Sequence, residues 1–443
     1  MFRSWVFDHL TRPAIFVEQE SISYEKLSLQ IENLALQFLK KGICNKHRVA
    51  FIATTHVHSL LIFFALLEIG ASPCPLSSRL PLKQIPIHLK QARASFFINS
   101  NFTVEKCAIE TCFIQNTTIL LFTSGSSGAP KLVSLKKEHF LASAEGSIEK
   151  LGLNQVKGCW LLSVPLFHVS GLSILFRCFS SGSSVAFSSN FLTGHPFASH
   201  ISLVPTQLMR YLSKEIYFPR LTCALLGGAP LSETLIQMAL VKKIPLYLTY
   251  GMTELASQIT MTSLSDLLLP IHLGKPLPGK EVNFSMEGEI LVKGSSLFTG
   301  YDSMLGVQKK LLEDGWFPTG DLGKWNQEGN LEYKGRKDNL FISGGENIYP
   351  ETIEEAIRSI PGVLQSLVVP LADQEFGHRP VAFVQTQNDT LPSKEEFHEK
   401  LSSLLPKFCL PVHFFPFPVQ EGEKSFKIKR SELKTWLKQS FLK

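Results

Sequence analysis

Apolar residues in the first 110 positions follow two alternating patterns, one typical of helices and one of buried strands. Residues 23–42, SYEKLSLQIENLALQFLKKG, carry apolar side chains three or four positions apart: Leu27, Ile31, Leu34 and Phe38. This spacing predicts an amphipathic helix that ends at Gly42. RVAFIAT then predicts a strand, residues 60–69 a second helix, and ASFFINS a second strand. Strand, helix and strand in succession indicate a parallel α/β sheet.

Five further apolar runs end in Gly, Ser or Pro: TILLFTS, CWLLSVP, SVAFSS, HISLVP and TCALLGG. Uninterrupted apolar runs are typical of parallel strands that are buried on both faces. The carboxyl ends of such strands are where α/β sheets bind ligands. After residue 280 the runs are shorter and separated by turn glycines, as in GEILVKG, GNLEYKG and DNLFISGG, which predicts antiparallel hairpins.

The last hundred residues have a pattern of their own. PETIEEAIRSI predicts a helix, LQSLVVP and RPVAFVQT predict strands, and EEFHEKLSSLL predicts another helix. Charged and turn residues cluster at GRKDN, between two glycine-punctuated strands, and the main boundary is placed there. The predicted architecture is α/β. A large N-terminal domain (1–337) has parallel α/β layers plus an antiparallel β section, and a small α+β domain (338–443) follows.

Composition excludes several classes of protein. A hydrophobic content of 44% with 19% charged residues is ordinary for a soluble globular chain. The net charge of +6 comes from lysines that are spread out, which favours a solvated surface over a nucleic-acid partner. The longest apolar run, Leu60–Leu67, is too short to span a bilayer. The N-terminus MFRSWVFDHL has an acidic residue and no small-residue cleavage site, so no signal peptide is expected.

The eight cysteines are scattered, with no Cys-x-x-Cys pair. In a chain of this length, that spacing predicts free buried thiols in a reducing compartment, not disulfides or a zinc site. We therefore expect a cytoplasmic protein.

The segment LLFTSGSSGAPK, residues 120–131, follows an apolar run with small and hydroxyl-bearing residues that cannot form a core. Backbone N–H groups, hydroxyls and Lys131 suit an anion such as phosphate, although a flexible connector has a similar composition. Its spacing is not the Walker pattern. A near-Walker string, GKPLPGKE at residues 274–281, is rejected because its prolines lack N–H groups. In addition, Glu281 replaces the hydroxyl residue that binds Mg²⁺.

Three more motifs place polar residues at expected strand ends or turns. YGMTE follows IPLYLT and offers an aromatic ring, a hydroxyl and the carboxylate of Glu254. WFPTGDLG is expected to put Asp321 in a tight turn, where it can accept two hydrogen bonds from a ribose. KGRKDNLFISGGENIYP puts Arg336 and Asp338 before a strand that ends in two glycines. Each motif alone also suits an ordinary solvated loop, so the argument depends on finding all of them in this order.

The order TSGSSGAPK, GGAP, YGMTE, TGD and GRKDNLFISGGENIYP closely resembles the adenylate-forming superfamily of acyl-CoA ligases, adenylation domains and luciferases. The resemblance extends from about Ser23 to the C-terminus. SVPLFHVSGLSILFR, HISLVPTQLMRYL, LADQEFGHRPVAF and the short length look most like the o-succinylbenzoate–CoA ligases of menaquinone biosynthesis. The resemblance implies an AMP-forming acid–thiol ligase that converts 2-succinylbenzoate, ATP and CoA to the thioester through an acyl-adenylate, with Mg²⁺.

Two alternatives stay open. One is an acyl-CoA ligase for another aryl or medium-chain carboxylic acid. The other is a non-catalytic acyl- or nucleotide-binding relative, which we would expect to have lost Glu254, Asp321, Arg336 or the C-terminal lysine. The implied partners are small molecules, with no nucleic acid and no membrane span, and a homo-oligomer is left open.

The resemblance implies roles for individual residues. The phosphates of ATP are expected at Thr123, Ser124, Gly125, Ser126, Ser127, Gly128 and Lys131. Adenine is expected at Gly227, Gly228, Ala229, Pro230 and Tyr250, and ribose at Asp321 and Arg336. Thr253 should contact phosphate and Glu254 the magnesium. Asp338 matches the hinge about which the small domain turns, and Gly344 and Gly345 should line the route of the CoA pantetheine arm.

The C-terminal catalytic lysine is less direct to assign, because the tail reads EGEKSFKIKRSELKTWL. Aligning Ile428, Arg430 and Leu433 with the usual ending makes it Lys427. Phe426 then stands where glycine is usual, which leaves Lys424 as the alternative. Leu132 also replaces a glycine, but it lies beyond the phosphate-contacting residues, so little effect is expected.

The acyl pocket has two candidate sources. His168, in PLFHVSG, matches the family's gate residue beside that pocket, whereas without the resemblance it reads as a buried core histidine. Thr206, Gln207 and Arg210 follow Pro205 in the first turns of an expected helix, where free N–H groups and the helix dipole favour an anion. Arg210 could pair with the benzoate carboxylate or lie on a solvated face.

Overall fold

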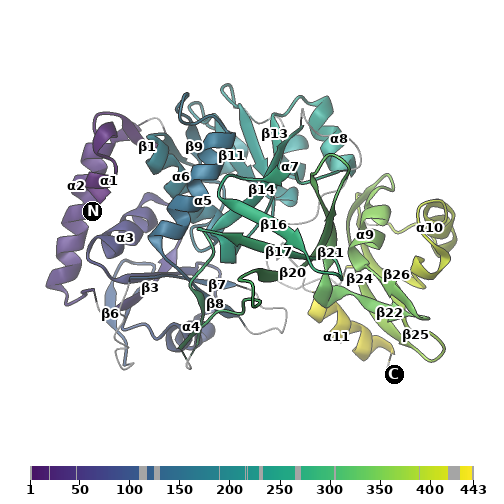
Figure 1. Ribbon diagram of the computed structural model, residues 1–443. Coiled ribbons are helices and arrows are strands. Elements are labelled where there is room, and N and C mark those ends of the chain that lie inside the picture. The colour runs from purple at the N-terminus through teal and green to yellow at the C-terminus, as the bar shows by residue number, and fades with distance from the viewer. Residues whose placement is uncertain are drawn as a thin grey trace.

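The computed structural model describes most of the 443 residues, and all statements below concern these: 2–18, 20–45, 47–108, 117–123, 130–188, 190–214, 216, 218–228, 233–264, 271–303, 306–388, 390–417 and 430–441. The described chain starts with the short helix α1 (Phe2–Trp5) and runs through six sheets toward α11 (Arg430–Phe441) at the C-terminal side (Figure 1).

A nine-stranded sheet forms the centre of the N-terminal part, in the order β15-β14-β13-β12-β11-β9-β10-β1-β2. Six strands run parallel: β1 (Pro13–Val17), β9 (Cys159–Leu161), β10 (Ser184–Phe187), β11 (His200–Leu203), β12 (Cys223–Leu226) and β13 (Leu246–Met252). Three antiparallel strands complete the edges: β2 (Glu20–Ser23), β14 (Ser257–Ser263) and β15 (Lys275–Pro276). The parallel strands predicted from CWLLSVP, SVAFSS, HISLVP and TCALLGG are confirmed.

Helices cover both faces of this sheet (Figure 1). They are α5 (Lys137–Lys150), α6 (Val169–Ser181), α7 (Pro205–Leu212) and α8 (Glu233–Val241). Neighbouring strand residues divide between two cores, because successive side chains point to opposite faces. Trp160 packs in the core that includes α6, and Leu161 packs in the core that includes α7 and α8. Burial on both faces explains why these strands read as uninterrupted apolar runs.

A second, four-stranded sheet has the order β4-β3-β5-β6. Its strands are β3 (Arg48–Ala53), β4 (Ser72–Ser77), β5 (Phe96–Ile98) and β6 (Val104–Lys106), with helices α2 (Tyr24–Lys40), α3 (Val57–Glu68) and α4 (Ile85–Ala92). β3 pairs in parallel with β4 and with β5, which confirms the strand–helix–strand prediction.

The prediction that TILLFTS is a parallel strand is wrong. β7 (Ile119–Thr123) pairs antiparallel with β8 (Lys131–Leu135), in a sheet of order β19-β18-β8-β7. The other two strands are β18 (Gly300–Ser303) and β19 (Gly306–Gln308). An apolar run reports burial, but the direction of the partner strand depends on where the chain returns. Here it returns immediately after residues 124–129.

The antiparallel section predicted after residue 280 is confirmed. One sheet has the order β16-β17-β20-β21, made of β16 (Lys280–Phe284), β17 (Glu289–Gly294), β20 (Phe317–Trp325) and β21 (Leu331–Arg336). The hairpin β22 (Phe341–Ser343) and β23 (Glu346–Ile348) follows. The C-terminal part has β24 (Val363–Asp373), β25 (Gly377–Thr386) and β26 (His413–Pro416), with helices α9 (Pro350–Arg358), α10 (Lys394–Leu401) and α11.

The buried apolar clusters separate along the chain. In the described residues, the N-terminal clusters include no buried side chain beyond Leu331, and the C-terminal clusters begin at Phe341. The two parts meet where β21 contacts α9, and these elements lie beside each other in Figure 1. There the Asn339 amide donates to Glu351 Oε1 at 2.7 Å.

The cysteines in the described residues are free. Four of them are buried, whereas Cys44, Cys107 and Cys409 are half-buried, so the expected burial holds for only part of the set. Among the helices described, none is long and apolar enough to cross a membrane.

The lysine of the rejected near-Walker string lies inside the protein. Lys280, in β16, is buried, and its ammonium donates to Ser296 Oγ. Burial lowers the pKa of Lys280 to about 7. Because the folded-state pKa lies below the unfolded value, the unfolded chain binds more protons between about pH 7 and pH 10. Stability contributed by this group therefore rises with pH across that window.

Replacing Lys280 with methionine should raise the free energy of unfolding at pH 7 by on the order of 1–4 kcal/mol, because a buried cation is replaced by an apolar chain. The gain should shrink toward pH 10, where the wild-type lysine is neutral. Urea unfolding at pH 7, 8.5 and 10 measures this difference. Lys275→Met, at an exposed position in β15, is the matched control. A gain in the free energy of unfolding that does not change with pH would contradict the lowered pKa of Lys280.

Candidate functional site

Three residues from separate motifs meet at the carboxyl end of strand β13. The Tyr250 hydroxyl donates to Asp321 Oδ2 at 2.7 Å, and Arg336 Nη1 donates to Asp321 Oδ1 at 3.0 Å. Asp321 and Arg336 face each other across β20 and β21. The predicted adenine residue and the predicted ribose pair are therefore brought together.

The expectation that Asp321 lies in a tight turn is wrong, because it lies within β20. Gly320, before it, has φ +74°, and a Cβ there would come 3.0 Å from Arg336 Nη2. The glycine thus makes room for the Arg336 guanidinium within the strand. The Gly in TGD, which suggested a turn, is therefore needed for this positive-φ position in β20.

The Asp321 carboxylate is buried, and burial raises its pKa, while Arg336 and the Tyr250 hydroxyl act in the opposite direction. Arg336 also donates to the Thr319 carbonyl and to Asp338 Oδ2, each at 3.2 Å. Each Asp321 oxygen accepts one of the protein hydrogen bonds described above and has further lone-pair capacity. A pair of ligand hydroxyls suits that capacity.

Glu254 lies next to this group, in the 3₁₀ turn η4 (Thr253–Leu255) after β13. It is buried, and its Oε1 accepts the Tyr301 hydroxyl at 2.6 Å. Gly251 is required just before it, since a Cβ there would come 2.0 Å from the Ser257 carbonyl oxygen. The Lys131 ammonium lies 5.0 Å from the Tyr301 ring centroid. A carboxylate and an ammonium from distant motifs thus meet around one tyrosine.

The donor set suits a magnesium ion that also binds a ligand's phosphates. No group of three His, Cys, Asp or Glu side chains that could hold a metal occurs in the part of the chain described. Mg²⁺ is usually bound through one or two carboxylates together with substrate phosphates, so a single buried Glu254 beside Lys131 fits it.

The other predicted nucleotide residues lie around the same strand ends. Thr123 closes β7, and its hydroxyl donates to the Lys131 carbonyl at 3.4 Å. Gly227 follows β12, and a Cβ on it would come 2.9 Å from Thr249 Cγ2. Gly228 has φ +82°. The remaining predicted residues lie outside the described ones: Ser124, Gly125, Ser126, Ser127, Gly128, Ala229 and Pro230.

The helix predicted after Pro205 is confirmed as α7. Gln207 Oε1 accepts the Val204 N–H at 3.1 Å, and its Nε2 donates to the Ser163 carbonyl at 2.9 Å. The Gln207 side chain therefore fixes the start of α7, and the second N–H of its amide remains available for a ligand. Thr206 and Arg210 are half-buried.

His168 immediately precedes α6 and is exposed, with its ring 4.5 Å from that of Phe167. The alternative that His168 is a buried core histidine is therefore wrong. An exposed ring at a helix entry leaves a gate role open.

Sequence reasoning missed Arg177, in α6. This residue is fully buried, its Nε donates to Ser147 Oγ at 3.1 Å, and its Nη2 donates to Gln258 Oε1. The guanidinium stacks 4.4 Å from the Trp160 ring centroid. Burial lowers the pKa of Arg177 to about 10. A lone arginine in the apolar run LSILFRCF was the available signal.

Arg177 also has an unused donor. Within the described residues, its Nη1 has no hydrogen-bond partner, and the same holds for Gln258 Nε2 and Thr260 Oγ1. Gln258 pairs with Gly251 and Thr260 with Tyr250, so these atoms lie on the strand beside the candidate site. Unpaired buried polar atoms are costly, and a cluster of them suits a polar ligand.

The residues predicted for domain movement and CoA lie at the start of the C-terminal part. Asp338 is exposed, in the 3₁₀ turn η6 (Lys337–Asn339). Gly344 and Gly345 form the turn between β22 and β23, with φ +59° and +87°. A Cβ on Gly344 would come 2.9 Å from the Phe376 ring. Both candidate lysines, Lys424 and Lys427, lie outside the described residues.

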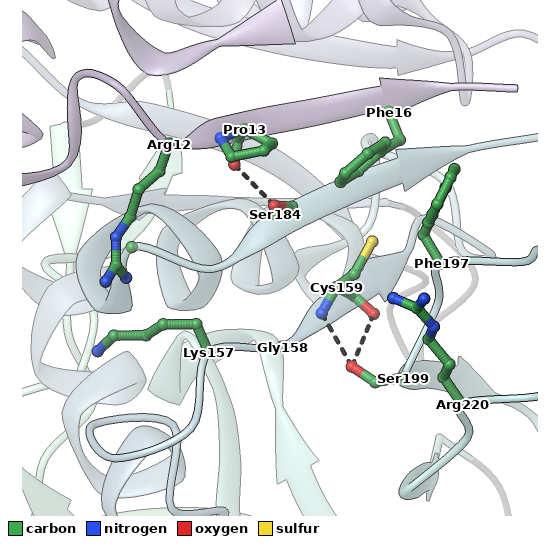
Figure 2. A pocket seen from close by; sticks show the side chains of 11 residues that line it. Arg12, Pro13, Phe16, Lys157, Gly158, Cys159, Ser184, Phe197, Ser199 and Arg220 are labelled. Atoms are coloured by element: carbon green, nitrogen blue, oxygen red, sulfur yellow. Dashed lines mark hydrogen bonds between the residues drawn. The ribbon is translucent and has the colours of Figure 1, made fainter. Parts of the chain in front are cut away.

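A cavity of about 420 Å³ lies at the opposite edge of the nine-stranded sheet, at the amino ends of β1, β9 and β10. Figure 2 shows Arg12 and Lys157 at one end of it and Phe197 and Arg220 at the other. None of the residues predicted from the motifs lines it. The candidate site is therefore at the carboxyl ends of the strands, where the motif residues gather.

Comparison with known proteins agrees with this geometry. The model of a family described as "AMP-binding enzyme" matches residues 2–112 and 105–302. A 2-succinylbenzoate–CoA ligase of Bacillus cereus is 31% identical over 461 residues, covering 96% of this chain and 95% of that protein.

Two solved structures are similar over nearly the whole chain. An arginine-to-lysine variant of E. coli MenE with bound OSB-AMS has a TM-score of 0.85 at 30% identity, covering 99% of this chain and 98% of that one. O-succinylbenzoate coenzyme A synthetase from Bacillus subtilis, in complex with ATP and magnesium ion, has a TM-score of 0.84 at 27% identity. The match covers 97% of this chain and 99% of that one.

Proposed function

The chain belongs to the AMP-binding enzyme family, and from this premise we propose that it is an AMP-forming 2-succinylbenzoate–CoA ligase of menaquinone biosynthesis. It converts 2-succinylbenzoate, ATP and CoA to 2-succinylbenzoyl-CoA, AMP and pyrophosphate. The observation that carries the proposal is the meeting of Tyr250, Asp321 and Arg336 beside Glu254, in a chain similar throughout to such ligases.

In the first half-reaction the substrate's succinyl carboxylate attacks the α-phosphorus of ATP and pyrophosphate leaves. Tyr250 packs against adenine, and Asp321 accepts from the ribose hydroxyls. Lys131 and Thr253 hold phosphate oxygens. Magnesium, bound by Glu254, offsets the negative charge of the phosphates. Lys427 supplies a further positive charge where the two anions approach.

In the second half-reaction the CoA thiol attacks the acyl carbon and AMP leaves. One lysine cannot stay over the phosphate while the pantetheine arm enters. We therefore assign residues 1–337 to ATP and acid binding and residues 338–443 to a domain that turns about Asp338. The separation of the apolar clusters between Leu331 and Phe341 supports that boundary. Gly344 and Gly345 then border the pantetheine route, and His168 borders the acyl pocket.

The substrate's second carboxylate must be bound while still charged, which is costly unless it is paired or well hydrogen-bonded. Thr206, Gln207 and Arg210 at the start of α7 are one candidate set. Arg177 is the stronger candidate, because it has an unused buried N–H. The two sets are connected. Trp160, beneath Arg177, donates to Ser202 Oγ, and the Ser202 carbonyl accepts from Ser163, whose own carbonyl accepts from Gln207.

Arg177→Lys should raise KM for 2-succinylbenzoate by about ten- to a hundredfold, because a compact ammonium cannot replace the forked donor. KM for ATP should change little. Arg210→Leu should have the smaller effect on the acid if Arg177 holds the carboxylate. Steady-state kinetics of both variants measure these KM values. A larger increase in KM for the acid in Arg210→Leu than in Arg177→Lys would assign the carboxylate to Arg210.

Incubation with ATP, CoA and a panel of acids tests the function as a whole. We expect 2-succinylbenzoate to give thioester far faster than benzoate, succinate or octanoate. Equal activity on octanoate would contradict the substrate and leave the ligase chemistry in place. The free cysteines are consistent with a cytoplasmic enzyme, which we also propose.

A further inference from the structure

Tyr301, in β18, contacts two residues of the proposed ATP site with one side chain. Its hydroxyl donates to Glu254 Oε1 at 2.6 Å, and the Lys131 ammonium lies 5.0 Å from its ring centroid. Glu254 lies in η4, after β13 of the nine-stranded sheet, whereas Lys131 begins β8 of another sheet, and Tyr301 contacts both.

The strand that carries Tyr301 is held firmly from its other face. Successive side chains of a strand point in opposite directions, so Asp302 points away from Tyr301. The Asp302 carboxylate is buried and takes two hydrogen bonds from Arg48, at 3.0 and 2.6 Å. Arg93 pairs with the same carboxylate. Bidentate, charge-assisted pairs are among the strongest and most directional polar contacts in proteins.

The backbone adds to this restraint. Tyr301 and Asp302 pair with Val133 and Leu132 of β8, the strand that begins at Lys131. The Glu254 carbonyl accepts the Phe298 N–H at 2.7 Å, just before β18. β18 therefore has fixed partners on both sides of the site, and the Tyr301 hydroxyl is presented to Glu254 in one position.

We propose that Tyr301 is a positioning residue for the magnesium-binding carboxylate, an inference that rests on the proposed function. By occupying Oε1 with a donor, Tyr301 fixes the plane of the Glu254 carboxylate and aims its remaining lone pairs at the metal. Its ring holds Lys131 by a cation–π contact, so that the ammonium faces the phosphates and does not fold onto Glu254. Outer hydrogen bonds of this kind typically change metal affinity by about 10–100-fold.

The test is the gain in nucleotide affinity that magnesium provides. Binding of α,β-methylene-ATP is measured by calorimetry with Mg²⁺ and with EDTA, for wild type and Tyr301→Phe. The variant keeps the ring and loses only the hydroxyl, so the fold and the Lys131 contact are preserved. In EDTA, we expect the affinity of the variant for the analogue to stay within about twofold of wild type. The factor by which Mg²⁺ increases that affinity should be about tenfold smaller in the variant than in wild type. In turnover, kcat should fall and KM for the acid should not.

Tyr24→Phe is the matched control. That hydroxyl is also buried and donates to the Ser183 and Cys178 carbonyls, away from the site, so its loss lowers stability without touching Glu254. An unchanged magnesium gain in Tyr301→Phe, or an equal loss in Tyr24→Phe, would overturn the inference and leave the proposed function in place. A wild-type protein with no magnesium gain would contradict the metal role itself, and the inference with it.

Discussion

Lys427→Ala should reduce acid-dependent ATP–pyrophosphate exchange by roughly a hundred- to a thousandfold, the effect typical of removing a group that stabilises developing charge. The variant should still convert supplied acyl-adenylate and CoA to thioester at close to the wild-type rate. The reason is that, in the proposed mechanism, Lys427 acts only while the carboxylate attacks the α-phosphorus. Once the adenylate has formed, the lysine must leave to admit CoA.

Lys424→Ala is the control, since it removes a lysine three positions earlier in the same tail. If exchange survives in Lys427→Ala and is lost in Lys424→Ala, the assignment of the catalytic lysine moves to Lys424. If both half-reactions fail together in Lys427→Ala, the residue is not specific to the first step.

Asp338→Pro should have the opposite effect to Lys427→Ala: it should keep adenylate formation and slow thioester formation. Proline locks φ near −65° and so hinders rotation at the proposed pivot. The side chain is exposed and accepts a hydrogen bond from Arg336, so little else is disturbed. We expect adenylate formation within a few-fold of wild type and thioester formation slower by roughly a hundredfold, the size of effect that misplaced reacting groups produce.

Rapid-quench analysis of the Asp338→Pro reaction should therefore show acyl-adenylate accumulating on the enzyme. Asp338→Ala, which keeps backbone freedom at the same position, should turn over much faster. Unchanged overall turnover in Asp338→Pro would show that the domain does not pivot there.

The sequence predicted the fold well wherever burial alone determines the pattern. CWLLSVP and its three companions read as uninterrupted apolar runs because helices cover both faces of their sheet, and their pairing is parallel as predicted. TILLFTS has the same apolar pattern but lies in an antiparallel sheet, because strand direction depends on the return of the chain. Asp321 was misplaced because a glycine that accommodates Arg336 within a strand gives the same signal as a turn.

The candidate site was predictable only as far as each motif carries its own signal. Tyr250, Asp321, Arg336 and Glu254 occur in recognisable strings, and the structure brings them together. Tyr301 occurs in no such string, and Arg177 only ends the string SVPLFHVSGLSILFR without a signal of its own, since the roles of both depend on partners that only the fold supplies. Gln207 was predicted from its helix position, but the same sequence position does not reveal that its amide already binds Val204 and Ser163.

The central claim is that the succinyl carboxylate of 2-succinylbenzoate attacks the α-phosphorus of ATP, and an isotope label tests it most directly. Substrate carrying ¹⁸O in both oxygens of the succinyl carboxylate is incubated with the enzyme, ATP, Mg²⁺ and CoA. Attack at the α-phosphorus places one labelled oxygen in AMP, and thiol attack then leaves the other in the thioester. We predict singly labelled AMP and unlabelled pyrophosphate by mass spectrometry. Unlabelled AMP, or ADP and phosphate as products, would contradict the account.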